Sequence, residues 1–389
     1  MAKGRARIMV VGVGGMGRGH LRNLLKIREA EVVAVADLNP EYVMEAGDEA
    51  GCPGFSNVKD AIRATRPQGA VIATPHPAHL AAARECFKGG LHVLCEKPLC
   101  SLSSEADRML AAAKKHRRKL AVMLQYRASI ACRRAREILD KGTIGRITRV
   151  HMVHVGLRTQ AYYDDRPWRG TWAGEGGGVL LNQSPHTIDR AIYLGGMPSR
   201  VFAECRTSGH RMETEDCAEA MLEYPNGATG YMLMTTAEHP GVNRLEIVGR
   251  KGKLCIEGNN DRLTLSTMKQ ALPAWMKKCR KVWASPEVET REISLKPRRG
   301  EDEGHSAVLR NFCALILGRQ KQAIAPGPDA RRSLELANAI TLSAFEGEAV
   351  KLPLARRKYD RIFKFACARG RGRKIQDTIA AWRRSSRSR

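Results

Sequence analysis

The sequence comprises 389 residues, of which 43% are hydrophobic, so its length allows two domains and its composition is ordinary for a globular protein. No apolar run reaches the roughly 18 residues that a membrane-spanning helix requires, so no segment should span a membrane. The basic start leads into an apolar run at 8–12, but glycines break that run too early for a secretory signal. We therefore expect a cytoplasmic protein whose first strand lies at 8–12.

The formal net charge is +26, and residues 355–389 alone carry thirteen Lys and Arg against two Asp. A basic surface can attract nucleic acid, membranes or anionic substrates, and it can also simply keep a protein soluble. The 355–389 segment contains no recognised nucleic-acid motif. We expect it to be a solvated basic tail or an oligomer contact, and nucleic acid is not favoured as a partner.

The eleven cysteines are spread from Cys52 to Cys367, and no two of them form a Cys-x-x-Cys pair. A disulfide framework or a structural zinc site would need closer, paired spacing. We expect reduced, mostly buried thiols. His151 and His154 stand three apart on an expected strand, so they should point to opposite faces and should not share a metal ion. We predict no metal site.

The first 125 residues alternate apolar strands with amphipathic helices. Strands are expected at 8–12, 31–37, 69–74, 92–95 and 120–125, and helices at 15–26, 42–50, 79–88 and 104–116. This alternation predicts an α/β domain with a doubly wound parallel sheet, because right-handed crossovers place helices on both faces.

The pattern changes after residue 125. A helix is expected at 129–141, strands at 147–157, 201–206, 217–224, 229–236, 244–249, 252–257 and 262–266, and helices at 304–317 and 329–345. The expected organisation is a first domain at 1–125, an α+β domain at 126–354 with a large, mostly antiparallel open sheet, and the tail at 355–389. An open sheet leaves a face to cover, so we expect a homo-oligomer, either a dimer or a tetramer.

A glycine-rich turn stands between the first expected strand and the first expected helix. Its residues are Gly12, Val13, Gly14, Gly15, Met16 and Gly17. Glycines at these positions permit a tight turn and a close approach of the backbone to a pyrophosphate, which the helix N-terminus also attracts. Asp37 ends the next strand, where a carboxylate accepts hydrogen bonds from a ribose 2′-hydroxyl and repels a 2′-phosphate. The pattern predicts NAD rather than NADP, and the alternative for Asp37 is an ordinary surface carboxylate.

Four segments in the order of the chain resemble the Gfo/Idh/MocA oxidoreductases, a family that includes glucose–fructose oxidoreductase and inositol dehydrogenase. The segments are residues 11–17, Thr74-Pro75, residues 92–99 and residues 176–189. The likeness extends from about residue 6 to 354. It implies a Rossmann domain that binds NAD, with Thr74, Pro75 and His79 at the cofactor.

Glu96, Lys97 and Pro98 follow an expected strand at the edge where open α/β sheets bind ligands. A lysine there can donate to a substrate hydroxyl and stabilise charge on its oxygen. The residue before a proline is held extended, which fixes the backbone of Lys97. The resemblance implies that Lys97 is catalytic and also contacts substrate and cofactor, and that Glu96 lies near the nicotinamide ribose. The alternative for Lys97 is a surface lysine in a turn.

The segment from Asn182 to Asp189 holds the second cluster. On a helix His186 would share a face with both of the other residues. Imidazole is suited to removing an alcohol proton near neutral pH, and the resemblance implies that His186 is the base. The family often has Asp where Asn182 stands, and an amide cannot take up a proton. Asp189 either orients His186 or caps local structure.

Four more residues are expected to contact the substrate. Trp168 and Arg169 lie in a segment that borders the substrate pocket in the family, where an aromatic ring can stack on a sugar and Arg can clamp an anion. Loop packing is the alternative. Tyr126 and Arg127 follow the last strand of the first domain and are also expected to face the pocket.

These observations favour an NAD-dependent dehydrogenase or reductase acting on the hydroxyl or keto carbon of a sugar, cyclitol or sugar derivative. The alternatives are an NAD-dependent glycosidase without net redox change and a non-catalytic NAD-binding regulator. The expected partners are a small sugar-type substrate and further copies of the chain, with no membrane.

Overall fold

The computed structural model describes residues 4–387, and the chain divides into two compact units. The first unit holds the chain up to Ala128 together with Gly174–Gly176 and Asp302–Leu334. The second unit holds Ser129–Ala173, Gly177–Glu301 and the chain from Glu335 onward. This division differs from the expected boundaries, because residues 302–334 return to the first unit and the basic tail forms part of the second.

Among the described residues the first unit contains a six-stranded parallel sheet in the order β3-β2-β1-β4-β5-β6. The strands are β1 (Ala6–Val11), β2 (Ala30–Ala36), β3 (Gly54–Phe55), β4 (Gly69–Ile72), β5 (His92–Cys95) and β6 (Leu120–Val122). The direction of winding reverses between β1 and β4, and ligands bind beyond the carboxyl ends of strands at such a point. The predicted doubly wound sheet is confirmed.

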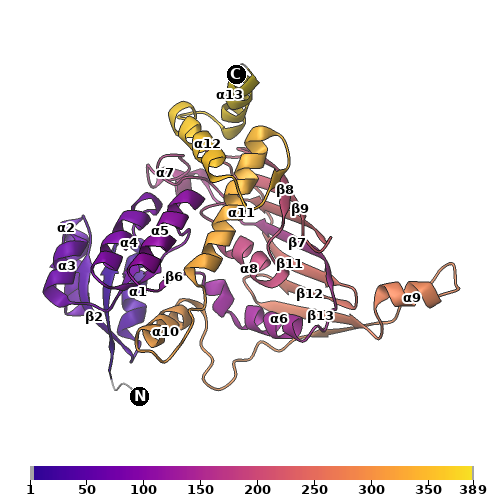
Figure 1. The fold of residues 1–389 in the computed structure, drawn as a ribbon, viewed down its shortest axis with the longest axis horizontal. Helices are drawn as coiled ribbons and strands as arrows, with labels where there is room; N and C mark the ends of the chain where they lie inside the picture. Colours follow the sequence, from indigo (N-terminus) through magenta and orange to yellow (C-terminus); the bar gives the residue numbers. More distant parts are fainter. Residues whose placement is uncertain (1–3, 388–389) are drawn as a thin grey trace. The chain divides into compact units, whose positions relative to one another are not determined.

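Helices accompany these strands in the predicted alternation (Figure 1). They are α1 (Gly15–Leu25), α2 (Pro40–Ala50), α3 (Val58–Thr65), α4 (His79–Lys88), α5 (Ser103–Lys115) and the short turns η1 (His76–Ala78) and η2 (Gln125–Ala128). Helix α10 (Gly304–Ile316) joins them from far along the chain and buries Leu309, Phe312 and Cys313 in the same apolar core as β1. A Cβ on Gly69 would lie 3.2 Å from the ring of Phe312, so the sheet and α10 pack without room for a side chain there. Burial of these side chains explains why residues 302–334 belong to the first unit.

The second unit contains a nine-stranded sheet among its described residues, in the order β14-β13-β12-β11-β7-β10-β9-β8-β15. The strands are β7 (Ile147–Val155), β8 (Arg200–Arg206), β9 (Cys217–Glu223), β10 (Thr229–Thr235), β11 (Val242–Gly249), β12 (Gly252–Glu257), β13 (Arg262–Met268), β14 (Val288–Glu292) and β15 (Val350–Lys351). Only β7 and β10 pair in parallel in this part of the chain, so the predicted mostly antiparallel sheet is confirmed.

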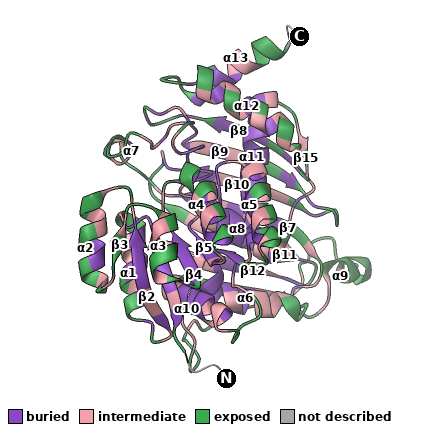
Figure 2. Cartoon of the chain, turned by 60° about the vertical axis from the view of Figure 1, so that its left-hand side comes forward, coloured by how far each residue is buried: buried purple, intermediate pink, exposed green. Residues whose placement is uncertain are grey.

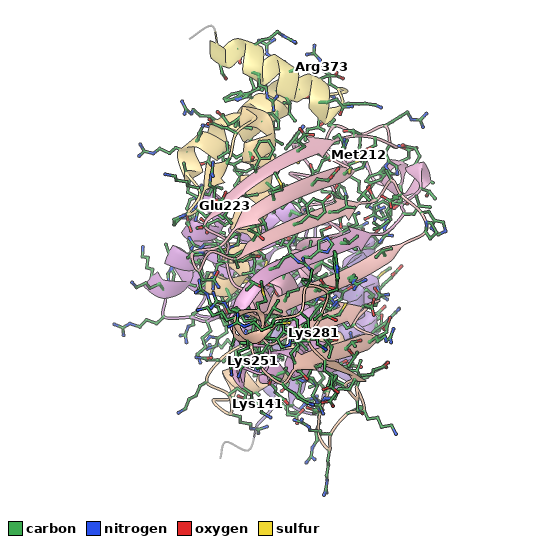
Figure 3. The ribbon with its side chains drawn as sticks, turned by 90° about the vertical axis from the view of Figure 1, so that its right-hand side faces the viewer. Lys141, Met212, Glu223, Lys251, Lys281 and Arg373 are labelled. Carbon is green, nitrogen blue, oxygen red and sulfur yellow. The ribbon has the colours of Figure 1, made fainter. Side chains whose placement is uncertain are left out.

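The two faces of this sheet differ in burial, and Figure 3 looks onto the face that is not covered by helices, while Figure 2 colours the chain by burial. On β7 the buried residues Val150 and Met152 alternate with Arg149 and His151, which remain accessible. Helix α8 (Pro185–Gly195) covers the buried face, where a Cβ on Gly195 would lie 2.7 Å from Val150. The helices α6 (Ile130–Asp140), α7 (Gln160–Asp164), α9 (Leu272–Lys278) and α11 (Gly327–Glu346) complete the elements before the tail, α11 beginning in the first unit.

The expectation of a solvated tail is wrong for most of 355–389. The segment forms α12 (Arg356–Arg369) and α13 (Ile375–Arg387), and Tyr359, Ile362 and Ile375 are fully buried. Apolar residues spaced three and four apart give α12 a face to bury, and the high charge of the segment hides this period in the sequence. The last two residues of the expected tail lie outside the described part.

Candidate active site

The glycine turn has the backbone geometry that the sequence predicts. Gly12 has φ +81°, and a Cβ there would lie 2.7 Å from the carbonyl carbon of Ala73. A Cβ on Gly17 would lie 1.7 Å from the carbonyl oxygen of Gly12, so neither position admits a side chain. Gly14 caps α1 without a side chain, and a Cβ on Gly15 would meet no described atom within 4 Å. The chain at Gly15, in the first turn of α1, therefore borders open space, and the N-terminus of a helix is where a phosphate group binds favourably.

Asp37 stands at the end of β2 and ties the glycine turn to this strand. Its Oδ2 atom accepts a hydrogen bond from Val13 N–H at 2.8 Å, and its Oδ1 atom accepts one from Asn39 N–H at 3.0 Å. A hollow of about 320 Å³ opens beside it. The residues around this hollow come from β2, α2 and β3: Asp37, Leu38, Pro40, Val43, Met44, Gly47, Asp48, Cys52, Gly54 and Ser56.

His79 connects the loops that follow β4 and β5. Its ring is fully buried, with Nε2 2.9 Å from the carbonyl oxygen of Thr74 and Nδ1 3.0 Å from that of Pro98. Burial lowers the pKa of His79, so the ring is neutral. His79 is thus hydrogen-bonded to the backbone of the turn at Thr74 and Pro75. Its side chain is fully buried and therefore has no exposed surface that could contact a cofactor.

Glu96 and Lys97 are held by a buried network with α1. The Glu96 Oε1 atom lies 2.5 Å from Nε2 of His20, its Oε2 atom accepts Lys97 N–H at 2.9 Å, and the peptide bond from Lys97 to Pro98 is cis. Burial disfavours the carboxylate, but the hydrogen bond and charge of His20 and the charge of Lys97 outweigh it and lower the pKa of Glu96 to about 2. An ionised carboxylate is therefore hydrogen-bonded to the backbone N–H of Lys97.

His20 was not predicted as a site residue. Its ring is buried, its Nδ1 atom lacks a hydrogen-bond partner among the described atoms, and the ring of His305 lies 5.6 Å away. His76 is also buried, and this burial is the main reason that its pKa is lowered to about 3. The signal for His20 was its place three residues after Gly17, on the face of α1 that carries the buried Leu21 and Leu24.

His186 and Asn182 do not share one helix, so that part of the prediction is wrong. Helix α8 begins at Pro185, His186 stands in its first turn, and Asn182 lies in the turn before it. Asp189 does lie on α8, three residues after His186, and it is buried. The Nδ2 atom of Asn182 donates to the hydroxyl of Tyr162 at 3.0 Å.

Tyr162 is the centre of an aromatic and cationic cluster. The guanidinium carbon of Arg169 lies 4.1 Å from the centroid of the Tyr162 ring and 5.5 Å from that of Trp168. Arg169 also donates to the Tyr162 carbonyl at 2.7 Å and to Asp165 at 3.1 Å. Tyr162 therefore contacts both Asn182 and Arg169, and Arg169 in turn contacts Trp168. The sequence did not single out Tyr162 as a site residue.

Glu215 is a second residue that sequence reasoning missed. It is completely buried, and its Oε1 atom accepts hydrogen bonds from Gly178 N–H at 2.8 Å and Leu180 N–H at 3.1 Å. Burial raises the pKa of Glu215 to about 7. A Cβ on Gly178 would lie 1.9 Å from the Glu215 carbonyl oxygen, so the glycine run packs directly against this residue. Glu215 thus fixes the turn that leads to Asn182 and His186.

Tyr126 and Arg127 lie on η2 in the first unit. Arg127 is buried and forms an ion pair with Asp329 at 3.1 Å, while Tyr126 is half-buried. The guanidinium of Arg127 therefore has a structural partner in addition to the substrate contact predicted for it.

His151 and His154 lie on opposite faces of β7, as expected. On the accessible face the ring centroids of His151 and Tyr231 lie 5.5 Å apart. On the other face Nδ1 of His154 lies 2.9 Å from the Ser184 hydroxyl. Burial, with the charges of Arg190 and Arg158, lowers the pKa of His154 to about 4. Over residues 4–387 no three His, Cys, Asp or Glu side chains come together as metal ligands, and none of the helices is long and apolar enough to cross a bilayer.

Both units match descriptions of one protein family. Residues 6–124 match the oxidoreductase family with an NAD-binding Rossmann fold, and residues 132–255 match the GFO/IDH/MocA C-terminal domain. The chain belongs to the GFO/IDH/MocA family. The predictions of an NAD-binding oxidoreductase with dehydrogenase chemistry, of NAD as its cofactor and of the two-part fold are therefore confirmed.

Two curated relatives illustrate the chemistry of this family. The chain is 25% identical to myo-inositol 2-dehydrogenase of Thermotoga maritima over 68% of its own length and 79% of that protein. It is 27% identical to levoglucosan dehydrogenase of Pseudarthrobacter phenanthrenivorans over 57% of its length and 63% of that protein. Neither relative favours the glycosidase or the non-catalytic regulator.

A solved structure agrees with this assignment. The WlbA dehydrogenase from Bordetella pertussis, in complex with NADH and UDP-GlcNAcA, is 27% identical and matches with a TM-score of 0.77, covering 90% of this chain and 99% of that one.

Proposed function

We propose that the enzyme transfers a hydride between NAD and a hydroxyl-bearing carbon of a cyclitol, a sugar or a sugar derivative, with Lys97 and His186 as its catalytic residues. The observation that carries the proposal is the fixed Glu96–Lys97 segment beyond β5, at the carboxyl edge of the sheet that bears the glycine turn. The relatives, named for inositol and levoglucosan, support the substrate class.

The residues of the first unit fit a dinucleotide. Gly12 and Gly17 leave no room for side chains, Gly15 at the start of α1 borders open space, and Asp37 lines a hollow of about 320 Å³. The turn and α1 would hold the pyrophosphate, and Asp37 would accept hydrogen bonds from the adenosine ribose. Thr74, Pro75, Glu96 and Lys97 would border the nicotinamide end. When bound, NAD supplies the hydride chemistry.

Lys97 orients the substrate oxygen and stabilises the negative charge that develops on it. Its ammonium group donates to the hydroxyl that is oxidised, an interaction that strengthens as this oxygen loses its proton. Glu96 remains ionised because its pKa is about 2, so it holds the Lys97 backbone without competing for the proton.

His186 accepts the proton of the same hydroxyl. Imidazole is effective for this step because its ordinary pKa lies near neutral pH. Asn182 and Tyr162 supply a hydrogen-bonding pair at 3.0 Å that suits further hydroxyls of a polyol, and Trp168 and Arg169 supply an apolar face and a cation. Asp189 is buried on α8, the helix that carries the proposed base.

Lys97→Met and His186→Ala test the proposal in a panel of cyclitols, sugars, sugar acids and nucleotide sugars, followed by the absorbance of NADH. Each variant should lose about 10²- to 10⁴-fold in kcat, the usual contribution of one acid–base group, while NAD binding stays within a few fold. Full turnover in both variants would reject the site, and a wild-type chain that binds NAD but oxidises no panel member would reject the substrate class.

The accessible face of the second unit's sheet carries a further part of the proposal, namely that the chain forms a homo-oligomer of two or four copies. This face has a hollow of about 580 Å³ between Arg149, His151 and Phe202, and Met221 beside it is 59% exposed. A second copy would bury these apolar side chains. Sedimentation equilibrium of wild type and Met221→Lys tests this: the variant should dissociate, and a monomeric wild type would reject the assembly.

The cysteines support a reducing, cytoplasmic setting. All eleven lie within residues 4–387, where none forms a disulfide, and seven are buried. Alkylation of the denatured chain without reductant should therefore label eleven thiols, and fewer labels would indicate disulfides and a different compartment.

A further inference from the structure

An arm at residues 269–287 projects from the edge of the second unit's sheet, between β13 and β14 (Figure 1). Its helix, α9, has seven residues, and none of these is buried. So short a helix is marginal in water unless it packs on something. Lys269 and Glu287 pair at 2.7 Å across the base of the arm and mark where it leaves the sheet.

The tip of the arm exposes large apolar side chains together. Trp283 is 93% exposed, Val282 86% and Met276 62%. Along α9 the apolar residues recur at spacings of three and four and give the helix one apolar stripe: Leu272, Trp275 and Met276. Single exposed apolar residues are common, but several large exposed apolar side chains on one short segment, including a tryptophan, mark a surface that contacts a membrane or another molecule.

The charges around these residues are all positive. From 270 to 286 the sequence has no Asp or Glu, and it has four cations: Lys277, Lys278, Arg280 and Lys281. All four are exposed, and none forms an ion pair within residues 4–387. Tryptophan and aliphatic side chains interleaved with unpaired lysines are the composition of segments that lie in the interface of an anionic bilayer.

We propose that the arm is a peripheral docking element for membrane surfaces rich in anionic phospholipid. Trp283, Val282 and Met276 enter the headgroup region, and the four cations attract the lipid phosphates. This contact lies on the surface and needs no spanning helix. It departs from the expectation of no membrane partner, which rested on the lack of long apolar runs.

Two other occupants fit the arm less well. A second copy of this chain has a net charge of +26, so it offers the four cations of the arm fewer acidic partners than an anionic bilayer does, and the homo-oligomer proposed above uses the face of the sheet around Met221 instead. A nucleic acid would match the charge, but it would stack on aromatic rings and gain little from Val282, Met276 and Leu272. A bilayer uses both the charges and the aliphatic side chains.

Vesicle flotation of the full-length chain with NAD present tests the proposal. The chain should float with vesicles of phosphatidylcholine mixed with phosphatidylglycerol, more at low than at high salt, and not with phosphatidylcholine alone. An apolar variant, Val282→Ser with Trp283→Ser, and a charge variant with Gln at all four cations should both lose flotation. Each cation should account for about fivefold in partitioning.

The matched control removes four exposed, unpaired cations elsewhere in the second unit by substitution with Gln: Arg361, Arg371, Arg373 and Lys374. Its net charge equals that of the charge variant, so retained flotation in the control and loss in the arm variant locate the contact in the arm. Circular dichroism and NADH binding check that all variants fold. Trp283→Phe should reduce the blue shift of tryptophan emission on adding anionic vesicles, and Trp275 of the same arm accounts for what remains.

Several results would overturn the proposal. These are no flotation of the wild type, equal flotation of arm variants and wild type, and equal loss in the control. Binding of a single-stranded oligonucleotide that depends on Trp283, without vesicle binding, would assign the arm to nucleic acid instead. A change in sedimentation that depends on the arm, again without vesicle binding, would assign it to a second copy.

Discussion

The buried carboxylate of Glu96 lies 2.5 Å from Nε2 of His20 and also accepts the backbone N–H of Lys97. His20 belongs to α1, the helix that the glycine turn opens, whereas Glu96 ends β5. This one buried contact therefore ties the helix of the proposed phosphate site and the backbone of the proposed catalytic lysine to the same sheet. Replacing Glu96 would leave the buried His20 Nε2 without this partner, and replacing His20 would leave the buried carboxylate with the Lys97 N–H alone.

Glu96 should make the stability of the wild type fall in acid. Folding lowers its pKa from 4.5 to about 2, so its stabilisation is present above pH 4.5 and is lost as the pH falls toward 2. The size of the shift corresponds to about 3 kcal/mol. Urea unfolding of wild type and Glu96→Gln from neutral pH into acid measures it: the variant should be weaker at neutral pH and should lose less on acidification. Parallel curves would contradict this role.

Much of the fold was predictable because it rests on local periodicity. The helix at 79–88 and the strands at 92–95 and 252–257 have the predicted bounds, since their apolar patterns end at glycines or charged residues. The tail was misjudged because its charge hides the buried stripe of Tyr359, Ile362 and Ala366. The expectation that Asn182 and His186 share a helix was wrong because α8 begins only at Pro185. The conformation of the preceding glycine run is set by its packing against Glu215, which the local sequence does not reveal.

The proposed site was predictable only where a residue follows a recognisable turn. The glycine turn, Asp37 and Lys97 stand at strand ends, so the parallel sheet alone brings them to one edge. His20 and Glu215 could not be found in this way. Each is a polar residue buried by an element distant in sequence, His20 against Glu96 and Glu215 against Gly178 and Leu180.

Glu215 should make the stability of the wild type fall as the pH rises, which is opposite to the effect of Glu96. Folding raises its pKa from 4.5 to about 7. The contribution of the protonated carboxyl group to the free energy of unfolding is therefore fully present below pH 4.5 and is lost as the pH rises through 7. Glu215→Gln keeps an oxygen for Gly178 N–H and Leu180 N–H but cannot ionise. Its urea midpoint should change less than that of wild type between acid and neutral pH, with about 3 kcal/mol at stake.

Glu215→Ala provides the contrast for this variant. It leaves two buried N–H groups without an acceptor, which costs about 1–3 kcal/mol each. If Gln and Ala destabilise equally at every pH, the carboxyl group does not hold the glycine run.

Gly178→Ala should be strongly destabilising, because its Cβ would lie 1.9 Å from the carbonyl oxygen of Glu215. The backbone on one side must move, and the turn that leads to Asn182 moves with it. We expect a loss of roughly 3 kcal/mol or more. Gly19→Ala in α1 is the control, since a Cβ there meets no described atom within 4 Å. Calorimetric unfolding of both variants compares them, and equal effects would show that the contact is not limiting.

Tyr162→Phe should weaken substrate binding more than it slows the chemical step. The hydroxyl of Tyr162 accepts from Asn182 at 3.0 Å and from Gln183 at 3.4 Å, so its loss removes one hydrogen bond that orients the Asn182 amide. One neutral hydrogen bond is worth about 1 kcal/mol, which corresponds to a rise of about fivefold in KM with little change in kcat. Because Asn182 cannot accept the proton from His186, Asn182→Ala should have a similar effect, and the double variant should add little to either. A loss of 10²-fold in kcat in either single variant would instead place this pair in the proton transfer itself.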